Sequence, residues 1–149
     1  MTYSETQLLL AEAVVRTWAT GDAAALFKSG VEAHMVQMAD YGPAAVIPVA
    51  DINAYTAANP LNAATALEQI NSQYWVSSFM NGSETWANFR RSGFPALTKN
   101  PYPSAEVTGN FIRRMTYPDR ETITNKANLD AAVAAQGPND LNTPVWWDK

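Results

Sequence analysis

The sequence predicts an all-α, mainly helical protein, and three observations lead to this fold class. Apolar residues recur at helical spacing through most of residues 5–93, and Gly or Pro stands where each periodic segment stops. Prolines interrupt the stretch after residue 94, where only residues 110–117 suit a short extended segment. The 149 residues are 47% hydrophobic and only 16% charged, which is the composition of a folded chain of one domain.

Residues 1–42 predict a tetratricopeptide-like helical hairpin. Ser4 and Gln7 have the spacing of a capping box, and an apolar stripe continues the first helix over about residues 5–19. Gly21 ends that helix, and Asp22 caps a second one that runs to residues 42–43. The two stripes consist of Leu8, Ala11, Val15 and Trp18, and of Phe27, Val31, His34, Met38 and Tyr41.

The short link between these helices makes them pack antiparallel, and Gly30 on the inner side lets their backbones approach closely. No second copy follows at a period of about 34 residues, so the hairpin is a single unit and not a solenoid. A single unit leaves one face unburied, which indicates missing neighbours.

Residues 51–93 predict three central helices. Asp51 caps a short helix that Pro60 stops, and a longer helix follows over about residues 64–80. Asn81 and Gly82 break that helix, and Ser83 caps a third helix that ends at residues 93–95. Apolar residues surround much of the longer helix, so we expect it at the centre of the fold.

Residues 94–149 predict a loop-rich tail with one short helix. Asn125 or Asn128 caps this helix, and residues 137–138 end it. The adjacent Trp146 and Trp147 are costly to leave in water, since each buries on the order of 200 Å². We therefore expect the end of the tail to be packed against the body.

Charge and composition exclude several classes of partner. The net charge of −4, with ten scattered basic residues, argues against nucleic acid. No apolar run reaches about 18 residues, and Glu5 and Glu12 interrupt the opening apolar segment, so we expect neither a spanning helix nor a signal peptide. Because the sequence has no cysteine, it encodes no disulfide and no lipid-bearing cysteine. Any membrane anchor is expected outside this sequence, as for an internal cut through a longer protein.

Few residue patterns indicate catalysis or a cofactor. His34, the single histidine, lies on an apolar stripe, which is typical of a hydrogen-bonded core residue rather than of a base or metal ligand. Neither Ser29 nor Ser92 has the GxSxG context of a hydrolase, and no pair of carboxylates stands out. Gly42, Gly82 and Gly93 each stand alone at a helix end, and no glycine-rich phosphate loop is present. We expect no catalytic residue, no metal and no cofactor.

Four aromatic residues are the candidate ligand contacts. Sugar rings stack on aromatic faces while polar side chains meet the ring edges. Trp75 and Trp86 stand at helical core spacing, so packing is the simpler interpretation and ligand contact the alternative. Tyr102 and Tyr117, in the proline-rich region, are more accessible candidates with no more specific support.

Two arginine pairs also allow both a structural role and a ligand contact. Arg90 and Arg91 can face a carboxylate or a sugar hydroxyl, but the simpler interpretation is that they cap the helix end and bridge to Glu84 or to the following loop. In the extended segment, Arg113 and Arg114 are expected on opposite sides, so only one of the two can face inward.

The order and spacing of one residue set resemble a known family. The set consists of the opening segment 5–13, residues 79–82, Glu84, Trp86, Arg90, Arg91, Gly93, Pro95, Arg113, Arg114, residues 117–118, Asn125, residues 131–136, Asp140 and residues 146–148. Together these residues resemble the carboxy-terminal part of the SusD/RagB family, the glycan-capturing lipoproteins on the outer-membrane surface of Bacteroidetes. The resemblance covers essentially the whole chain, which is much too short to be a whole member.

This resemblance implies a helical protein built on tetratricopeptide repeats that binds oligosaccharides or other nutrients without cleaving them. Such proteins act at the outer membrane over a SusC-like TonB-dependent transporter, which the repeats contact. No family binding residue can be matched by motif to a position here. The alternative is a protein-interaction module, in which the unburied face of the hairpin docks a partner and the ligand site lies outside this sequence.

Overall fold

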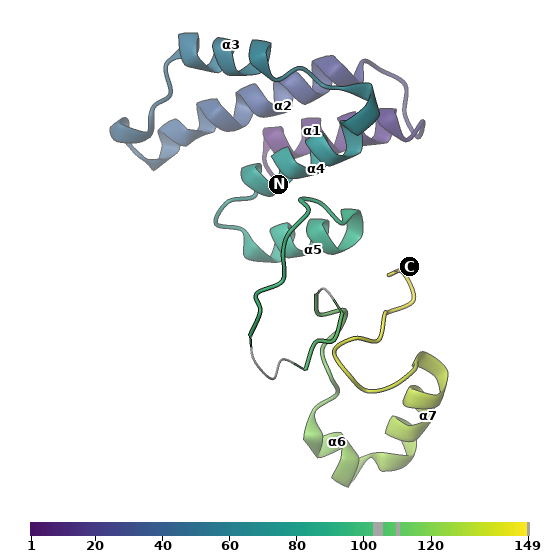
Figure 1. Cartoon of the computed structure of the whole chain (residues 1–149). Coiled ribbons are helices and arrows are strands. Elements are labelled where there is room, and N and C mark those ends of the chain that lie inside the picture. Colours follow the sequence, from purple (N-terminus) through teal and green to yellow (C-terminus); the bar gives the residue numbers. More distant parts are fainter. Residues whose placement is uncertain (103–105, 110, 149) are drawn as a thin grey trace. The chain divides into compact units, whose positions relative to one another are not determined.

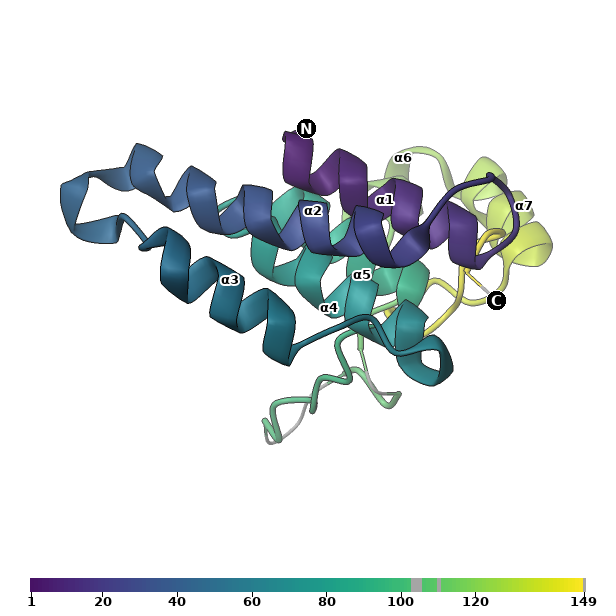
Figure 2. The same cartoon turned by 90° about the horizontal axis from the view of Figure 1, so that it is seen from above.

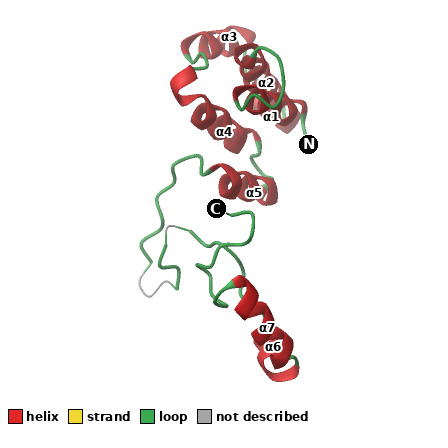
Figure 3. Ribbon diagram, turned by 90° about the vertical axis from the view of Figure 1, so that its right-hand side faces the viewer, coloured by secondary structure: helices red, strands yellow, loops and turns green. Residues whose placement is uncertain are grey.

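The computed structural model describes residues 1–102, 106–109 and 111–148, in two compact units, Met1–Pro95 and Ala96–Lys149. The described residues contain seven α-helices and no strand (Figure 3), so the predicted all-α fold is confirmed. The boundary between the units falls where the prolines begin to exclude long helices. That the chain forms one domain remains a prediction.

Five α-helices build the first unit (Figure 1). Helix α1 packs along α2, α4 lies against α1, α3 lies against α2, and α5 lies against α4 (Figure 2). The 3₁₀ turns η1 and η2 join α2 to α3, and η3 leads into α4. The bounds are α1 Tyr3–Val15, α2 Ala23–Gln37, η1 Met38–Tyr41, η2 Pro43–Ala45, α3 Val49–Ala58, η3 Ala63–Thr65, α4 Ala66–Ser77 and α5 Gly82–Ser92.

The core of this unit lies between α1, α2 and α4. Its side chains come from the stripes that the spacing predicts, and α4 supplies a buried face, as expected of a central helix. Gly30 packs directly on α1, because a Cβ built at this position would lie 2.8 Å from Cγ of Leu8. The hydroxyl of Ser4 donates to the carbonyl of Gly30 at 2.7 Å. The core residues are Leu8, Ala11, Phe27, Val31, Ile70 and Tyr74.

Helix α1 begins and ends earlier than predicted. Its capping box consists of Thr2 and Glu5 rather than Ser4 and Gln7, because Ser4 uses its hydroxyl to reach α2. The helix ends where Thr17 adopts a positive φ of 61°, and the N–H of Trp18 donates to the carbonyl of Ala13 at 2.8 Å. This Schellman-type end replaces the stop predicted at Gly21. Trp18, predicted on the apolar stripe, is 73% exposed.

The other boundaries in this unit shift by a few residues. Asp22 caps α2 as predicted, accepting from Ala24 and Ala25. Helix α3 begins directly after Pro48, its N-cap residue, and Asp51 lies inside it rather than at its cap.

Helix α4 stops before the predicted residue 80, because Met80 has a φ of 68°. Asn81, not Ser83, caps α5. Gly93 ends α5 at φ 77° as predicted.

The second unit contains one helix more than predicted. Helix α6, Asp119–Thr124, follows Pro118, and Asn125 separates it from α7, Lys126–Gln136. Six residues are too few to show a helical period, so no apolar pattern predicts α6. The predicted extended segment forms no strand within residues 111–117, and residue 110 lies outside the described residues.

Polar contacts within the second unit hold the end of the tail. The N–H of Arg113 donates to the carbonyl of Leu141 at 2.7 Å, and its guanidinium pairs with Asp148 at 2.6 Å. Trp146 is 88% exposed and Trp147 is 44% exposed. That the tail packs against the body remains a prediction. The ion pair of Asp148 with Arg113 links the end of the tail to residues 111–117.

Gly30→Ala tests the close approach of α1 and α2. The added methyl would meet Leu8 at 2.8 Å and the carbonyl of Ser4 at 3.3 Å, so we expect a loss of about 1–3 kcal/mol in the free energy of unfolding. The matched control is Gly82→Ala, whose methyl meets nothing within 4 Å. Urea denaturation of the two variants should separate them, and equal stability would show that the helices do not approach as described.

Candidate functional site

A buried carboxylate lies where α1, α4 and α5 meet. Glu12 is only 3% exposed, and each of its oxygens accepts from the guanidinium of Arg91 at 2.7 Å. Arg16, one turn along α1, donates Nε to the same carboxylate at 2.7 Å. Arg91 also donates to Oδ1 of Asn71 at 3.2 Å and of Asn88 at 2.6 Å. We call these five residues the Glu12 network.

Within this network, Glu12 and Arg91 each stabilise the charged form of the other. Burial by itself would raise the pKa of Glu12, but the hydrogen bonds and positive charges of Arg91 and Arg16 outweigh it and hold that pKa below its ordinary value. The hydrogen bond to Glu12 in turn raises the pKa of Arg91. Glu12 is therefore a carboxylate at neutral pH and serves as a structural acceptor rather than as a proton donor.

The sequence contains one signal for this network. Glu12 lies beside Leu8, Ala11 and Val15 on the buried side of its helix, and a carboxylate on a buried face needs a partner. Local sequence does not identify that partner, because Arg91 lies 79 residues further along the chain. Arg91 faces a carboxylate, which is one of the two interpretations given for the arginine pair, and this carboxylate is Glu12.

A second polar contact joins α4 to α5. The buried Tyr74 donates its hydroxyl to Oε1 of Glu84 at 2.7 Å. Burial and the acceptor Glu84 raise the pKa of Tyr74, so the phenol stays neutral and remains a donor. This contact holds the first turn of α5, while Arg91 holds its last turn.

Helices α4 and α5 also bring three aromatic rings together. Trp75 meets Phe89 edge-on, with ring centres 5.8 Å apart and planes at 72°. The ring of Trp86 also contacts Phe89, with ring centres 5.6 Å apart and planes at 31°. Phe89 is buried, whereas Trp86 remains 36% exposed. In this aromatic cluster, Trp75 and Phe89 pack, and Trp86 leaves part of its surface to solvent.

The two candidate tyrosines belong to the second unit and differ in their surroundings. Tyr102 is 71% exposed. Tyr117 is half-buried, its hydroxyl lies 3.4 Å from Oε1 of Gln136, and the guanidinium of Arg114 lies 4.8 Å from the centre of its ring. One face of Tyr117 is therefore occupied by a cation–π contact.

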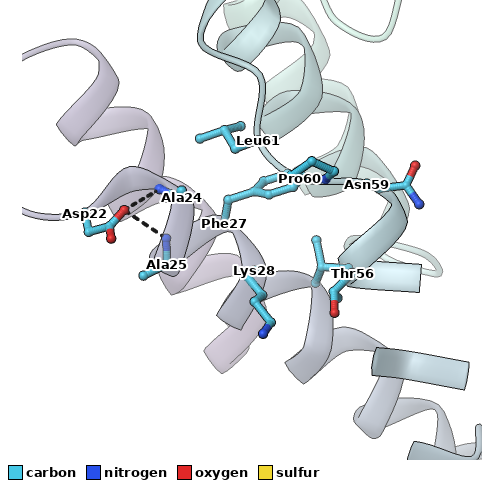
Figure 4. Close-up of a pocket in the computed structure, with 10 residues that line it drawn as sticks. Asp22, Ala24, Ala25, Phe27, Lys28, Thr56, Asn59, Pro60 and Leu61 are labelled. Carbon is cyan, nitrogen blue, oxygen red and sulfur yellow. Dashed lines mark hydrogen bonds between the residues drawn. The ribbon is translucent and has the colours of Figure 1, made fainter. Parts of the chain in front are cut away.

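A small pocket opens between α2 and the end of α3. Its volume is about 280 Å³, and Figure 4 labels residues that line it, among them Phe27 and Lys28 of α2 and Asn59 and Pro60 at the end of α3. Dashed lines in the figure mark the hydrogen bonds by which Asp22 caps α2. The lining is largely apolar, with Asp22, Ala24, Ala25, Phe27, Lys28, Val31, Thr56, Asn59, Pro60 and Leu61.

A wider groove lies between α1 and α2. It has a volume of about 460 Å³ and is more open than the pocket. Leu10 and Val14 line it from α1, and Leu26 lines it from α2. This groove corresponds to the face that a single hairpin leaves without a neighbour.

The described residues offer no metal site. No group of three or more His, Asp or Glu side chains among them is placed to hold an ion. His34 is half-buried, and burial lowers its pKa. Its Nδ1 has no hydrogen-bond partner, so the predicted hydrogen-bonded core histidine is wrong in that respect.

Comparison with known proteins decides the family. A model of the SusD-like family, described as "Starch-binding associating with outer membrane", matches residues 1–118. The chain belongs to this SusD-like family. Its members are carbohydrate-binding, non-catalytic components, so the expectation of no enzymatic activity is confirmed at the level of the family. Among the described residues, no helix is both long and apolar enough to cross a membrane.

Solved structures of SusD-like proteins share the fold. A chitin-binding protein is 42% identical, with a TM-score of 0.87, over 99% of this chain and 33% of that one. A SusD-like protein of the Bacteroidetes is 33% identical, with a TM-score of 0.86, and the match covers 100% of this chain and 30% of that one. A SusD homologue from Bacteroides fragilis is 30% identical, with a TM-score of 0.84, and the match covers 100% of this chain and 35% of that one.

The chain thus spans about a third of the length of these structures. A search of curated proteins found no match. The family description names starch, and the name of one of these relatives specifies chitin binding.

The network predicts an acid-dependent loss of stability. Because the pKa of Glu12 is lowered by folding, its contribution is present above its ordinary value near 4.5 and is lost as the pH falls through the folded-state value. Glu12→Gln should cost about 1–3 kcal/mol in the free energy of unfolding at neutral pH, with the difference from wild type narrowing in acid.

Urea denaturation between about pH 7 and pH 3 measures this difference. The control is Glu32→Gln, because Glu32 pairs at 3.6 Å with a largely exposed Lys28 and should contribute little at any pH. A Glu12→Gln variant that stays as stable as wild type at neutral pH would contradict the role given to the carboxylate.

Proposed function

We propose that the chain is a segment of a non-catalytic glycan-binding protein of an outer-membrane uptake system. The protein binds an oligosaccharide and passes it to a SusC-like TonB-dependent transporter. The observation that carries this proposal is the 42% identity to a chitin-binding protein over 99% of the chain. The family description, which names starch binding and the outer membrane, supports it.

Within the first unit, Trp86 is the residue best placed to meet a sugar ring. A pyranose presents C–H groups on its faces and hydroxyls at its edge, so it stacks on an indole that is both exposed and held in place. Trp86 meets both conditions, because Phe89 backs its ring at 5.6 Å while 36% of the residue remains exposed. Trp75 supports the cluster from its edge, and its role in this proposal is packing.

The second unit offers Tyr102 as a further contact. Its exposure of 71% leaves the ring free to stack. Tyr117 is a weaker candidate, since Arg114 already lies over one face of its ring and Gln136 is near its hydroxyl. We therefore rank Trp86 and Tyr102 ahead of Trp75 and Tyr117 as ligand contacts.

A second candidate function is protein docking through the hairpin, with the ligand site outside this segment. One observation favours it: the groove between α1 and α2 is open and lined by Leu10, Val14 and Leu26. The same surface is the proposed contact for the transporter or for another part of a longer protein. In this case the segment would bind no glycan by itself.

A calorimetric titration of the 149-residue chain with chito-oligosaccharides and malto-oligosaccharides distinguishes the two candidate functions, glycan binding and protein docking. We expect saturable binding of one glycan class, and Trp86→Ala should weaken it by about 1 kcal/mol, or roughly fivefold in Kd, because the stacking surface is lost. The matched control is Trp18→Ala, which removes an equally large and more exposed indole from another part of the unit.

Binding that Trp86→Ala leaves unchanged would remove Trp86 from the ligand surface. No binding by a chain that unfolds cooperatively would favour the docking function and contradict glycan binding by this segment.

A further inference from the structure

Asn81 and Gly82 form the sole Asn-Gly pair in the sequence, and they lie in the turn between α4 and α5. Both residues are exposed. The turn is tight, since Met80 before it has a φ of 68° and the N–H of Asn81 donates to the carbonyl of Ser78 at 2.9 Å. This pair therefore stands outside the core, where water reaches it.

The backbone nitrogen of Gly82 is accessible for reaction with the side chain of Asn81. Gly82 is the first residue of α5, so no carbonyl of that helix can accept its N–H. A Cβ built on Gly82 would meet nothing within 4 Å, and glycine itself adds no side chain that blocks approach. The capping bond that holds the Asn81 side chain, from N–H of Glu84 to Oδ1, is long at 3.4 Å.

We propose that Asn81 is a site of spontaneous deamidation through a cyclic succinimide. The backbone nitrogen of Gly82 loses its proton to hydroxide and attacks Cγ of Asn81. A bond forms between that nitrogen and Cγ, the bond from Cγ to Nδ2 breaks, and Nδ2 leaves as ammonia after taking a proton from water. Water then opens the ring at either carbonyl, which gives aspartate or isoaspartate. No oxidant or reductant takes part.

Two other asparagines of the first unit, Asn71 and Asn88, are protected from this reaction. Asn71 is buried, its Nδ2 donates to the carbonyl of Leu67 at 2.9 Å, and its Oδ1 accepts from Arg91. Asn88 is also buried and accepts from Arg91 at 2.6 Å. Both lie inside helices, where the next backbone nitrogen is hydrogen-bonded and the backbone cannot rotate to reach the side chain.

The two products differ in what they do to α5. Aspartate keeps a capping oxygen and adds a negative charge that the helix N-terminus favours. Isoaspartate places an extra methylene in the backbone and removes from the chain the Asn81 carbonyl, which accepts from N–H of Thr85 at 3.0 Å and from its hydroxyl at 2.9 Å. Isoaspartate therefore loosens the start of the helix that carries Trp86.

The test is to incubate the full chain at neutral and mildly alkaline pH and follow the chymotryptic peptide ending at Trp86 by mass spectrometry. We expect a gain of about 1 Da at Asn81, faster at the higher pH because more of the Gly82 nitrogen is deprotonated. Labelling by an isoaspartate methyltransferase should appear with it. Gly82→Ala, which leaves the fold intact, should slow the gain several-fold, and Asn81→Gln should abolish it.

A parallel sample in urea gives the rate for the unfolded chain. A folded chain that gains no mass at Asn81 while the unfolded chain does would overturn the proposal, because the turn would then protect the residue. An equal rate in Gly82→Ala would also overturn it, and so would equal mass gain at Asn71 or Asn88.

Discussion

The pairing of Glu12 with Arg91 is the interaction on which the arrangement of the first unit depends. A carboxylate on the buried side of α1 is strongly destabilising unless a partner meets it, and the partner comes from the last helix of the unit. Apolar packing has no direction, whereas a two-pronged guanidinium–carboxylate contact fixes both distance and orientation. Because Arg91 also reaches Asn71 and Asn88, one side chain sets α1, α4 and α5 relative to each other.

The pairing of Glu12 with Arg91 also helps to hold α5, the helix that carries the candidate sugar contact Trp86. Helix α5 has eleven residues, too few to be stable alone in water, and its ends are held by different contacts. Arg91 fixes the last turn, and the Tyr74–Glu84 hydrogen bond fixes the first. Between them lies Trp86, whose ring rests on Phe89. A ring positioned in this way loses little conformational freedom on binding, which is what a stacking contact for a sugar requires.

Sequence periodicity predicted the hairpin and α4 because their apolar stripes match the helical repeat, and Asp22, Gly30 and Gly93 act as predicted. The same reasoning missed α6, which is shorter than two turns, and misplaced Trp18, whose burial depends on tertiary contacts. The partner of Glu12 could not be predicted for the same reason, since Arg91 comes close only in the folded chain. The sequence predicted that aromatic residues would contact a sugar, but it could not choose among the four candidates. Preferring Trp86 to Trp75 required the positions of both rings relative to Phe89.

The most direct measurement is a double-mutant cycle between Glu12 and Arg91, with Glu12→Gln, Arg91→Met and both together, read as free energies of unfolding in urea. If the pair sets the arrangement of the three helices, the coupling energy should be about 1–3 kcal/mol, so that the double variant is more stable than the sum of the single losses predicts. A coupling below about 0.5 kcal/mol would show that the two residues act independently and would contradict the central role given to their contact.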